Sequence, residues 1–429
     1  MTLLMGFAPQ LSRADHVDVA GPADGSGPPR REMGQGLGQK MGDVAHRANG
    51  SFAAVSERLQ AAFASWIEAQ RAALAVVTGA SGVPGTDLDT AEGYRWVTRL
   101  SALALEWMVE KSDPLHPQLF VLQDEYRKLL VDNPDVHYLF CVLDDSRSYR
   151  LRGTRGEGAY VGMTFGTPFG QGPVGGRTGT QTQCHIDEFD IGPGGEVDIL
   201  LAPPDAMPEP RPRNAIVLEP GTAQLAIRET HFDKVHDQLS DLRVELVDDP
   251  SRPVPPPLLS SDELAPKLEM AAMFLTFVGA TALQMWHDAA TNMNSFGGGA
   301  GSEHVAAQDD EVRSHSNAEM TYHGGRFRLD PGQALVVTVE EPQRPFLYWG
   351  LTLTSPWCES FDSRYTTTAL NNRSAERSAD GRWRLVIAPT DPGLPNWLDT
   401  GGRLEGYMLV RWVLADGPPH PTCELISYL

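Results

Sequence analysis

Four side chains in two short segments have the types and spacing that proton transfer needs. In the run HIDEFD at 185–190, an extended strand would place His185 and Asp187 on one face, because side chains alternate along a strand. A histidine within reach of a carboxylate can act as a general base. Tyr322 and His323 follow a glycine-rich segment and could serve as acid and base on a loop. The alternatives are an exposed sheet edge for the first pair and solvent-exposed loop residues for the second.

A second group of side chains could orient a small substrate. The segment DPGLPNWLDT at 391–400 holds Asn396 and Asp399, whose polar groups either bind a ligand or satisfy their own turn. Arg411 lies inside the apolar run MLVRWVL and needs a carboxylate if it is buried, with Asp391 or Asp399 as the predicted partner. The other predicted substrate-binding residues are Arg228, Asn371 and Trp349. For Trp349 core packing is the first expectation, since tryptophans in sheets usually anchor a core.

The sequence predicts neither a metal site nor a nucleotide cofactor. His231 and His236 are five residues apart, which does not place them on one helical face. The run AVVTGASGVPG at 75–85 is similar to a dinucleotide-binding glycine loop, but a helical pattern precedes it and the chain has no Tyr-x-x-x-Lys. The Gly-x-Ser-x-Gly elbow of serine hydrolases is also missing from the sequence.

The charge and cysteine content narrow the partners and the compartment. The chain has 429 residues, with 35 Lys and Arg against 56 Asp and Glu, for a formal net charge of −21. Phosphate binding depends on lysine and arginine, so we expect neither nucleic acid nor an anionic membrane surface as a partner. The four cysteines lie far apart and the first residues lack a signal-peptide pattern, which predicts a reduced, cytoplasmic protein.

The elements that must position these residues begin with a helical part. Residues 1–50 are rich in glycine, proline and charge and are expected to form a flexible tail. Residues 51–131 are expected to form a helical segment, because apolar residues recur there at helical spacing. Its second helix would begin with a capping box of Asp89 and Glu92.

A third helix is expected within residues 259–300, ahead of a glycine-rich loop. Ser260 and Glu263 provide its capping box, and residues 268–286 are apolar nearly all round. About 20 apolar residues suffice to cross a membrane. However, Glu269 and the lack of flanking basic residues favour a helix buried between two domains, with no membrane span.

Residues 132–258 and 301–429 are each expected to form a β-sandwich domain. Short alternating or apolar runs such as HYLFCVL and RWRLVIA are separated by Gly, Pro and Asp turns. The long segment 166–183 is typical of a lid or binding loop. The predicted fold class is mainly β with added α-helices, in which two jelly-roll-like sandwich domains of similar topology follow an N-terminal helical segment.

Several phrases of the sequence resemble a known family. Tyr348-Trp349 with Trp357, the segment 391–400 and Arg411-Trp412 resemble the DUF1214 family of bacterial proteins. Upstream, Asn133-Pro134-Asp135 with Tyr138 is similar to a DUF1254-like first module. The resemblance implies two β-sandwich domains of similar topology with helical additions. It implies no activity.

Together these features predict an enzyme that acts on an uncharged or weakly polar small organic molecule, such as a lipid, terpenoid, steroid or sugar. Acid–base chemistry in a mostly apolar cleft between the two sandwiches would make it a lyase, isomerase or hydrolase. The alternative is a non-catalytic sandwich that binds a glycan or lipid or mediates assembly. A homo-oligomer is compatible with both readings.

Overall fold

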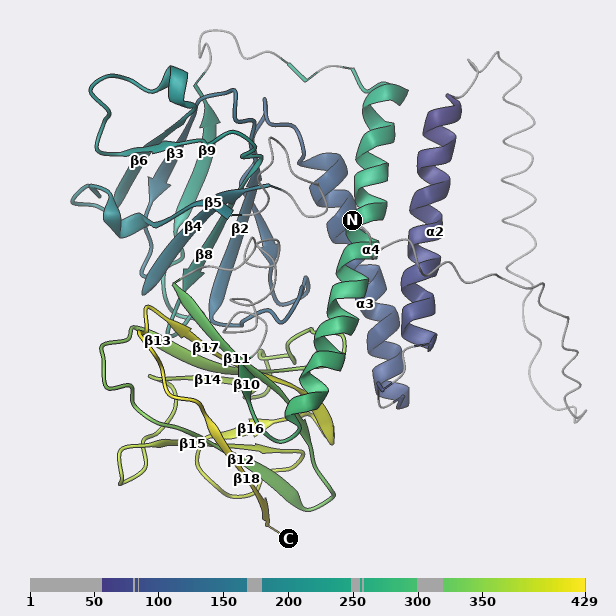
Figure 1. Cartoon of the computed structure of the whole chain (residues 1–429), viewed down its shortest axis with the longest axis vertical. Helices are drawn as coiled ribbons and strands as arrows, with labels where there is room; N and C mark the ends of the chain where they lie inside the picture. Colours follow the sequence, from purple (N-terminus) through teal and green to yellow (C-terminus); the bar gives the residue numbers. More distant parts are fainter. Residues whose placement is uncertain are drawn as a thin grey trace, which may run out of the picture. The chain divides into compact units, whose positions relative to one another are not determined.

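The computed structural model describes residues 56–79, 82–83, 85–167, 180–247, 255–256, 258–298 and 319–428 (Figure 1). The predicted tail (1–50) and most of the predicted binding loop (166–183) lie outside the described residues. Elements carry the labels of Figure 1.

The helical part consists of three long helices. They are α2 (Glu57–Gly79), α3 (Asp87–Leu105), which continues into the π-helical turn η1 (Glu106–Glu110), and α4 (Ser261–Asp288). The capping box of α4 is the predicted one, because the Glu263 amide donates to Ser260 Oγ at 3.2 Å and the Ser260 amide donates to Glu263 Oε2 at 2.9 Å. The predicted capping box of α3 was wrong by three residues: Thr86 and Asp89 form the box, in place of Asp89 and Glu92, so the helix starts earlier than expected.

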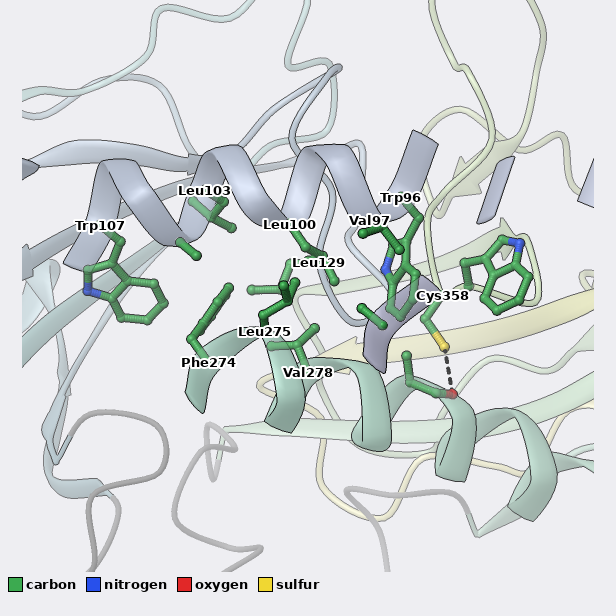
Figure 2. Close-up of a cluster of buried hydrophobic side chains, with 14 of the residues drawn as sticks. Trp96, Val97, Leu100, Leu103, Trp107, Leu129, Phe274, Leu275, Val278 and Cys358 are labelled. Carbon is green, nitrogen blue, oxygen red and sulfur yellow. Dashed lines mark hydrogen bonds between the residues drawn. The ribbon is translucent and has the colours of Figure 1, made fainter. Parts of the chain in front are cut away.

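Helix α4 lies beside α2 and packs on α3 (Figure 1). By length and composition α4 could cross a membrane, but helices of soluble cores share these properties. Figure 2 shows how Phe274, Leu275 and Val278 of α4 meet Leu100 and Leu103 of α3. The same core includes Phe140 from the first β module and Cys358 from the second, so the helices cover residues of both modules.

The first module contains nine strands among the described residues. They are β1 (Phe120–Gln123), β2 (Val136–Val142), β3 (Tyr149–Thr154), β4 (Tyr160–Gly166), β5 (Thr180–His185), β6 (Glu196–Ala202), β7 (Ala215–Val217), β8 (Gln224–Thr230) and β9 (Asp241–Leu246). They form two sheets, ordered β1-β2-β8-β4-β5 and β7-β6-β3-β9. Because β1 pairs with β2, the first module begins inside the range 51–131 that was expected to be helical.

The second module has β10 (Gly297–Gly298), β11 (Met320–Arg328), β12 (Gln333–Val339), β13 (Tyr348–Thr354), β14 (Ala369–Asn371), β15 (Trp383–Ala388), β16 (Trp397–Asp399), β17 (Glu405–Val413) and β18 (Thr422–Ser427). Its sheets are ordered β10-β11-β17-β13-β14 and β16-β15-β12-β18. Each strand of the first module therefore corresponds to the strand nine places later. The parallel pair β6–β7 recurs as the parallel pair β15–β16. The expectation of two modules of similar topology is confirmed.

Each module buries its own apolar core between its two sheets. Leu151, Met163 and Ile199 belong to the first core, and Leu335, Leu351 and Trp412 to the second. Because side chains alternate along a strand, the residues between these core residues point to the opposite face of each sheet. In the sheets that contain β4 and β13, these opposite faces carry the polar residues described below.

Candidate active site at the seam between the two modules

The opposite faces of the β4 and β13 sheets meet in a contact that we call the seam. Its apolar part is a cluster of Tyr160, Met320, Tyr348 and Val413, with residues from both modules. Each sheet contributes a Tyr-x-Gly-x-Thr run, at residues 160–164 in β4 and 348–352 in β13. A Cβ at Gly162 would lie 2.4 Å from Tyr160 Oη, and one at Gly350 would lie 2.0 Å from Tyr348 Oη. Both tyrosine side chains thus extend over a glycine that leaves them room.

An arginine and a second tyrosine complete the repeated pattern in each sheet. Arg228 is opposite Gly162 in the strand register and donates to Thr164 Oγ1 at 3.2 Å. Arg411 is opposite Gly350 and donates to Thr352 Oγ1 at 3.3 Å. Tyr138 is paired with Arg228 in register, and Tyr322 is paired with Arg411. Equivalent strands of the two modules therefore present the same side chains to the seam.

The acids that face these tyrosines precede the second strand of each module. Asp135 comes just before β2 and accepts a hydrogen bond from Tyr348 Oη at 2.8 Å. Glu319 comes just before β11 and accepts one from Tyr160 Oη. Each tyrosine thus binds the acid of the other module. Asp135 also accepts from Asn371 Nδ2 at 2.9 Å, and burial raises the pKa of its carboxyl group against the effect of these two donors.

A shallow recess, open to solvent and with a cavity volume of about 20 Å³, lies where the loop before β2 passes the seam. Its polar and charged lining residues are Gln123, Asp124, Glu125, Lys128, Asp132, Asn133, Tyr138, Lys234 and Ser363. This lining is polar, whereas the sequence predicted a mostly apolar cleft between the sandwiches. None of the four predicted proton-transfer residues lines this recess.

The two lysines of the recess differ in their partners. Lys128 Nζ lies 3.5 Å from Asp132 and donates to Ser360, whose own hydroxyl donates to Asp132 at 2.6 Å. Lys234, by contrast, makes no hydrogen bond or close ion pair with any residue that the structure describes. Its pKa is lowered because desolvation of the ammonium group outweighs the attraction of nearby carboxylates such as Glu125. The chain has only five lysines, so two of them in one recess is a notable concentration.

Three of the six non-glycine residues with positive φ in the described part of the chain lie near the recess. Leu130 and Val131 have φ angles of 46° and 62°, and Cys358 has a φ of 57°. Such values are uncommon for residues other than glycine, and are least expected for a β-branched residue. The Val131 amide donates to the Cys358 carbonyl at 2.7 Å, so the strained loops of the two modules hold each other. Strain of this kind tends to gather at functional sites.

Tyr322 and His323 do not form an acid–base pair. They are adjacent in strand β11, not on a loop, and therefore point to opposite faces. Tyr322 faces the seam, whereas His323 is buried with its ring centroid 4.3 Å from that of His420. Burial lowers the pKa of His323 to about 4, so this imidazole is neutral at pH 7.

The predicted pairing of His185 with Asp187 is also wrong. Strand β5 ends at His185 and a 3₁₀ turn, η2 (Ile186–Glu188), follows, so strand alternation does not extend to Asp187. Asp187 instead forms a bidentate ion pair with Arg155, at 2.7 and 2.9 Å. The carboxylate nearest to His185 within its own segment is Glu188, at 3.5 Å from Nε2.

The predicted orienting residues divide between the seam and structural positions. Arg228, Arg411 and Asn371 lie at the seam. Arg411 does not pair with Asp391 or Asp399, because its guanidinium donates to the Val131 carbonyl. Asp399 accepts a hydrogen bond from the Gly401 amide at 2.7 Å. Its carboxylate therefore satisfies its own turn, which was the alternative to ligand binding.

Two further predicted residues hold the second module together. Asn396 accepts from the Glu376 amide at 2.7 Å and donates to the Arg384 carbonyl at 2.9 Å, so its polar groups serve the fold. Trp349 is fully buried in the core, where its ring centroid lies 5.1 Å from that of Trp383. The first expectation for Trp349, core packing, is confirmed.

Comparisons with known proteins support the fold and name no activity. No protein-family model matches the chain, and no curated protein matches it. The crystal structure of an uncharacterized protein from Burkholderia cenocepacia is similar, with a TM-score of 0.74 and 28% sequence identity, over 86% of this chain and 98% of that one. The VPA0106 protein from Vibrio parahaemolyticus gives a TM-score of 0.46 and 12% identity, over 78% of this chain and 98% of that one. The DUF1214 resemblance stays a prediction.

Proposed function

We propose that the protein is an enzyme that acts on a small polar organic molecule in the recess by side-chain acid–base chemistry. The observation that carries this proposal is Lys234, a half-buried lysine without a hydrogen bond to any described residue, in a recess with other polar side chains. A lysine is normally protonated at pH 7, and desolvation is the usual means by which a protein makes its amine available as a base. A positioned base of this kind contributes about 10²- to 10⁴-fold to a rate.

The surroundings of Lys234 suit proton abstraction from a bound substrate. Lys128 and Asp132 line the recess, and the buried Ser360 holds both of them in place through hydrogen bonds. Tyr138 Oη accepts from the Asn133 amide at 3.1 Å, which fixes a hydroxyl at the same recess. Proton abstraction is a first step of lyases and isomerases, so the proposal favours these two classes over a hydrolase. The polar lining also favours a substrate more polar than the sequence suggested.

We also propose that the protein is cytoplasmic and has no nucleic-acid partner. All four cysteines, Cys141, Cys184, Cys358 and Cys423, are free thiols, as a reducing compartment would keep them. The net charge of −21 disfavours phosphate backbones. The proposal is compatible with a homo-oligomer, and the oligomeric state is a property to be measured.

The proposal is tested by a ligand screen followed by turnover. Small hydroxy acids, keto acids and sugars are screened by thermal shift against the full chain, and each stabilising compound is followed by proton NMR for conversion. We expect conversion by the wild type to fall at least about 100-fold in Lys234→Met. Lys267→Met is the matched control, because Lys267 lies in α4 and its Nζ donates to the Val109 carbonyl at 3.2 Å, away from the recess.

Two outcomes count against the proposal. Equal conversion by the wild type and Lys234→Met would remove Lys234 from the chemistry. A compound that stabilises the wild type but not Lys234→Met, and is never converted, would support the alternative of a non-catalytic binding module.

A further inference from the structure

Three potential metal ligands meet at the end of the seam opposite to Asp135. They are His185 at the end of β5, Glu188 in η2, and Glu319 just before β11. Their ligand atoms all lie within 4.8 Å of one another. Glu319 belongs to the second module and the other two to the first, so the cluster forms only when the modules are joined.

The repeated architecture shows what is special about this cluster. Asn371 in β14 is opposite Gly350, just as His185 in β5 is opposite Gly162. Asp135 and Glu319 hold equivalent places before β2 and β11, and each accepts a tyrosine hydroxyl from the other module. At the Asp135 end, the amide of Asn371 satisfies the acid. At the Glu319 end an imidazole replaces that amide, and a second carboxylate, Glu188, is added.

We infer that His185, Glu188 and Glu319 bind a divalent transition-metal cation such as Zn²⁺ or Mn²⁺. Metal–ligand bonds of 2.0–2.2 Å in tetrahedral geometry place ligand atoms roughly 3.4 Å apart. The distance of 3.5 Å between His185 Nε2 and Glu188 Oε1 agrees with this spacing. One imidazole nitrogen and two carboxylate oxygens form a donor set suited to these cations. Two close carboxylates also repel each other unless a cation lies between them.

Outer contacts hold the ligands in place. The Tyr160 hydroxyl donates to Glu319, and the backbone amide of His185 donates to Glu188 Oε1 at 2.9 Å. The Tyr160 ring also lies beside the imidazole, with 6.1 Å between ring centroids. Partners of this kind typically affect metal affinity by about 10- to 100-fold. This site does not depend on Lys234, which is at the Asp135 end of the seam.

The test is metal titration of the full chain after treatment with a chelator. Isothermal titration with Zn²⁺ and visible absorbance with Co²⁺ should show one site per chain. His185→Asn copies the residue found at the equivalent place, Asn371, and should leave an amide able to donate to Glu319, so we expect a folded chain. It should weaken Zn²⁺ binding by more than about 100-fold, and Tyr160→Phe should weaken it by about 10- to 100-fold.

His236→Asn is the matched control, because His236 lies 2.8 Å from a carboxylate oxygen of Asp233 on the exposed surface. It should leave Zn²⁺ stoichiometry and affinity unchanged. The inference is overturned if the wild type binds neither Zn²⁺ nor Mn²⁺ stoichiometrically. It is equally overturned if folded His185→Asn binds Zn²⁺ as tightly as the wild type.

Discussion

Glu359 should make the protein less stable as the pH rises toward neutral. This residue follows β13 in the strained loop around Cys358 and is only 3% exposed. Arg99 Nη1 donates to its Oε2 at 2.7 Å, whereas Oε1 accepts no hydrogen bond from a described residue. Burial outweighs the attraction of Arg99 and raises the pKa of Glu359 to about 7. The perturbation is Glu359→Gln, which keeps the shape and removes the titration.

The size of the effect follows from the shift. The ordinary pKa is 4.5 and the folded value is about 7, and each unit corresponds to 1.36 kcal/mol, so the difference is about 3 kcal/mol. Because the pKa of Glu359 is higher in the folded state than in the unfolded state, its protonation contributes fully to the free energy of unfolding of the wild type below pH 4.5. The wild type loses this contribution as the pH rises through 7. The unfolding entropy is roughly 2.1 cal/mol/K per residue, taken over the compact part of the chain, Val55–Leu429. The free-energy difference therefore corresponds to about 4 °C in Tm.

The assay is thermal unfolding of the wild type and Glu359→Gln between pH 4.5 and 8 at one scan rate. We expect the Tm of the wild type to fall by about 4 °C relative to Glu359→Gln across this range. Glu376→Gln removes an exposed carboxylate of the same module and should show no such trend. A wild type that gains stability over Glu359→Gln with rising pH would show that Arg99 dominates and that the reasoning on burial is wrong.

Three further substitutions test the seam and the helical part, with urea or thermal unfolding as the measurement. Tyr348→Phe removes a hydroxyl that binds both Asp135 and Asn133, and should cost about 1–3 kcal/mol; a cost below 0.5 kcal/mol would contradict a buried network. Gly350→Ala should destabilise by several kcal/mol, because its Cβ would lie 2.0 Å from Tyr348 Oη, and a neutral result would refute the close packing. Gly279→Ala in α4 should instead stabilise by about 0.5–1 kcal/mol, since its Cβ meets only Trp96 at 3.7 Å; a loss of stability would show that α4 packs more tightly there.

Local patterns in the sequence were enough to predict much of the fold. The α4 helix could be predicted because Ser260 and Glu263 form a capping box and the apolar run is long. The two related modules could be predicted from strand-like runs separated by turns. A sharper signal was available in the Tyr-x-Gly-x-Thr runs that begin at Tyr160 and Tyr348, since both also lie opposite an arginine-bearing strand.

The candidate site was harder to predict because its contacts join distant segments. The Arg411 guanidinium binds a carbonyl at Val131, in a strained loop that no local pattern identifies. His185 lost its expected partner because a 3₁₀ turn begins directly after it. Tyr322 and His323 were predicted to lie on a loop, but they lie in strand β11. Because side chains alternate along a strand, these two point to opposite faces of the sheet. The scarcity of lysine was the available clue to Lys128 and Lys234, although only the fold brings the two together.

The central claim is that the recess makes the amine of Lys234 available as a base, and its titration tests this claim most directly. Reductive methylation with ¹³C-formaldehyde labels the five lysines of the chain, and Lys234→Arg identifies the signal of Lys234. We predict that Lys234 titrates below 10.5, the ordinary value, because its ammonium group is desolvated. A midpoint for Lys234 at or above 10.5 would contradict the account.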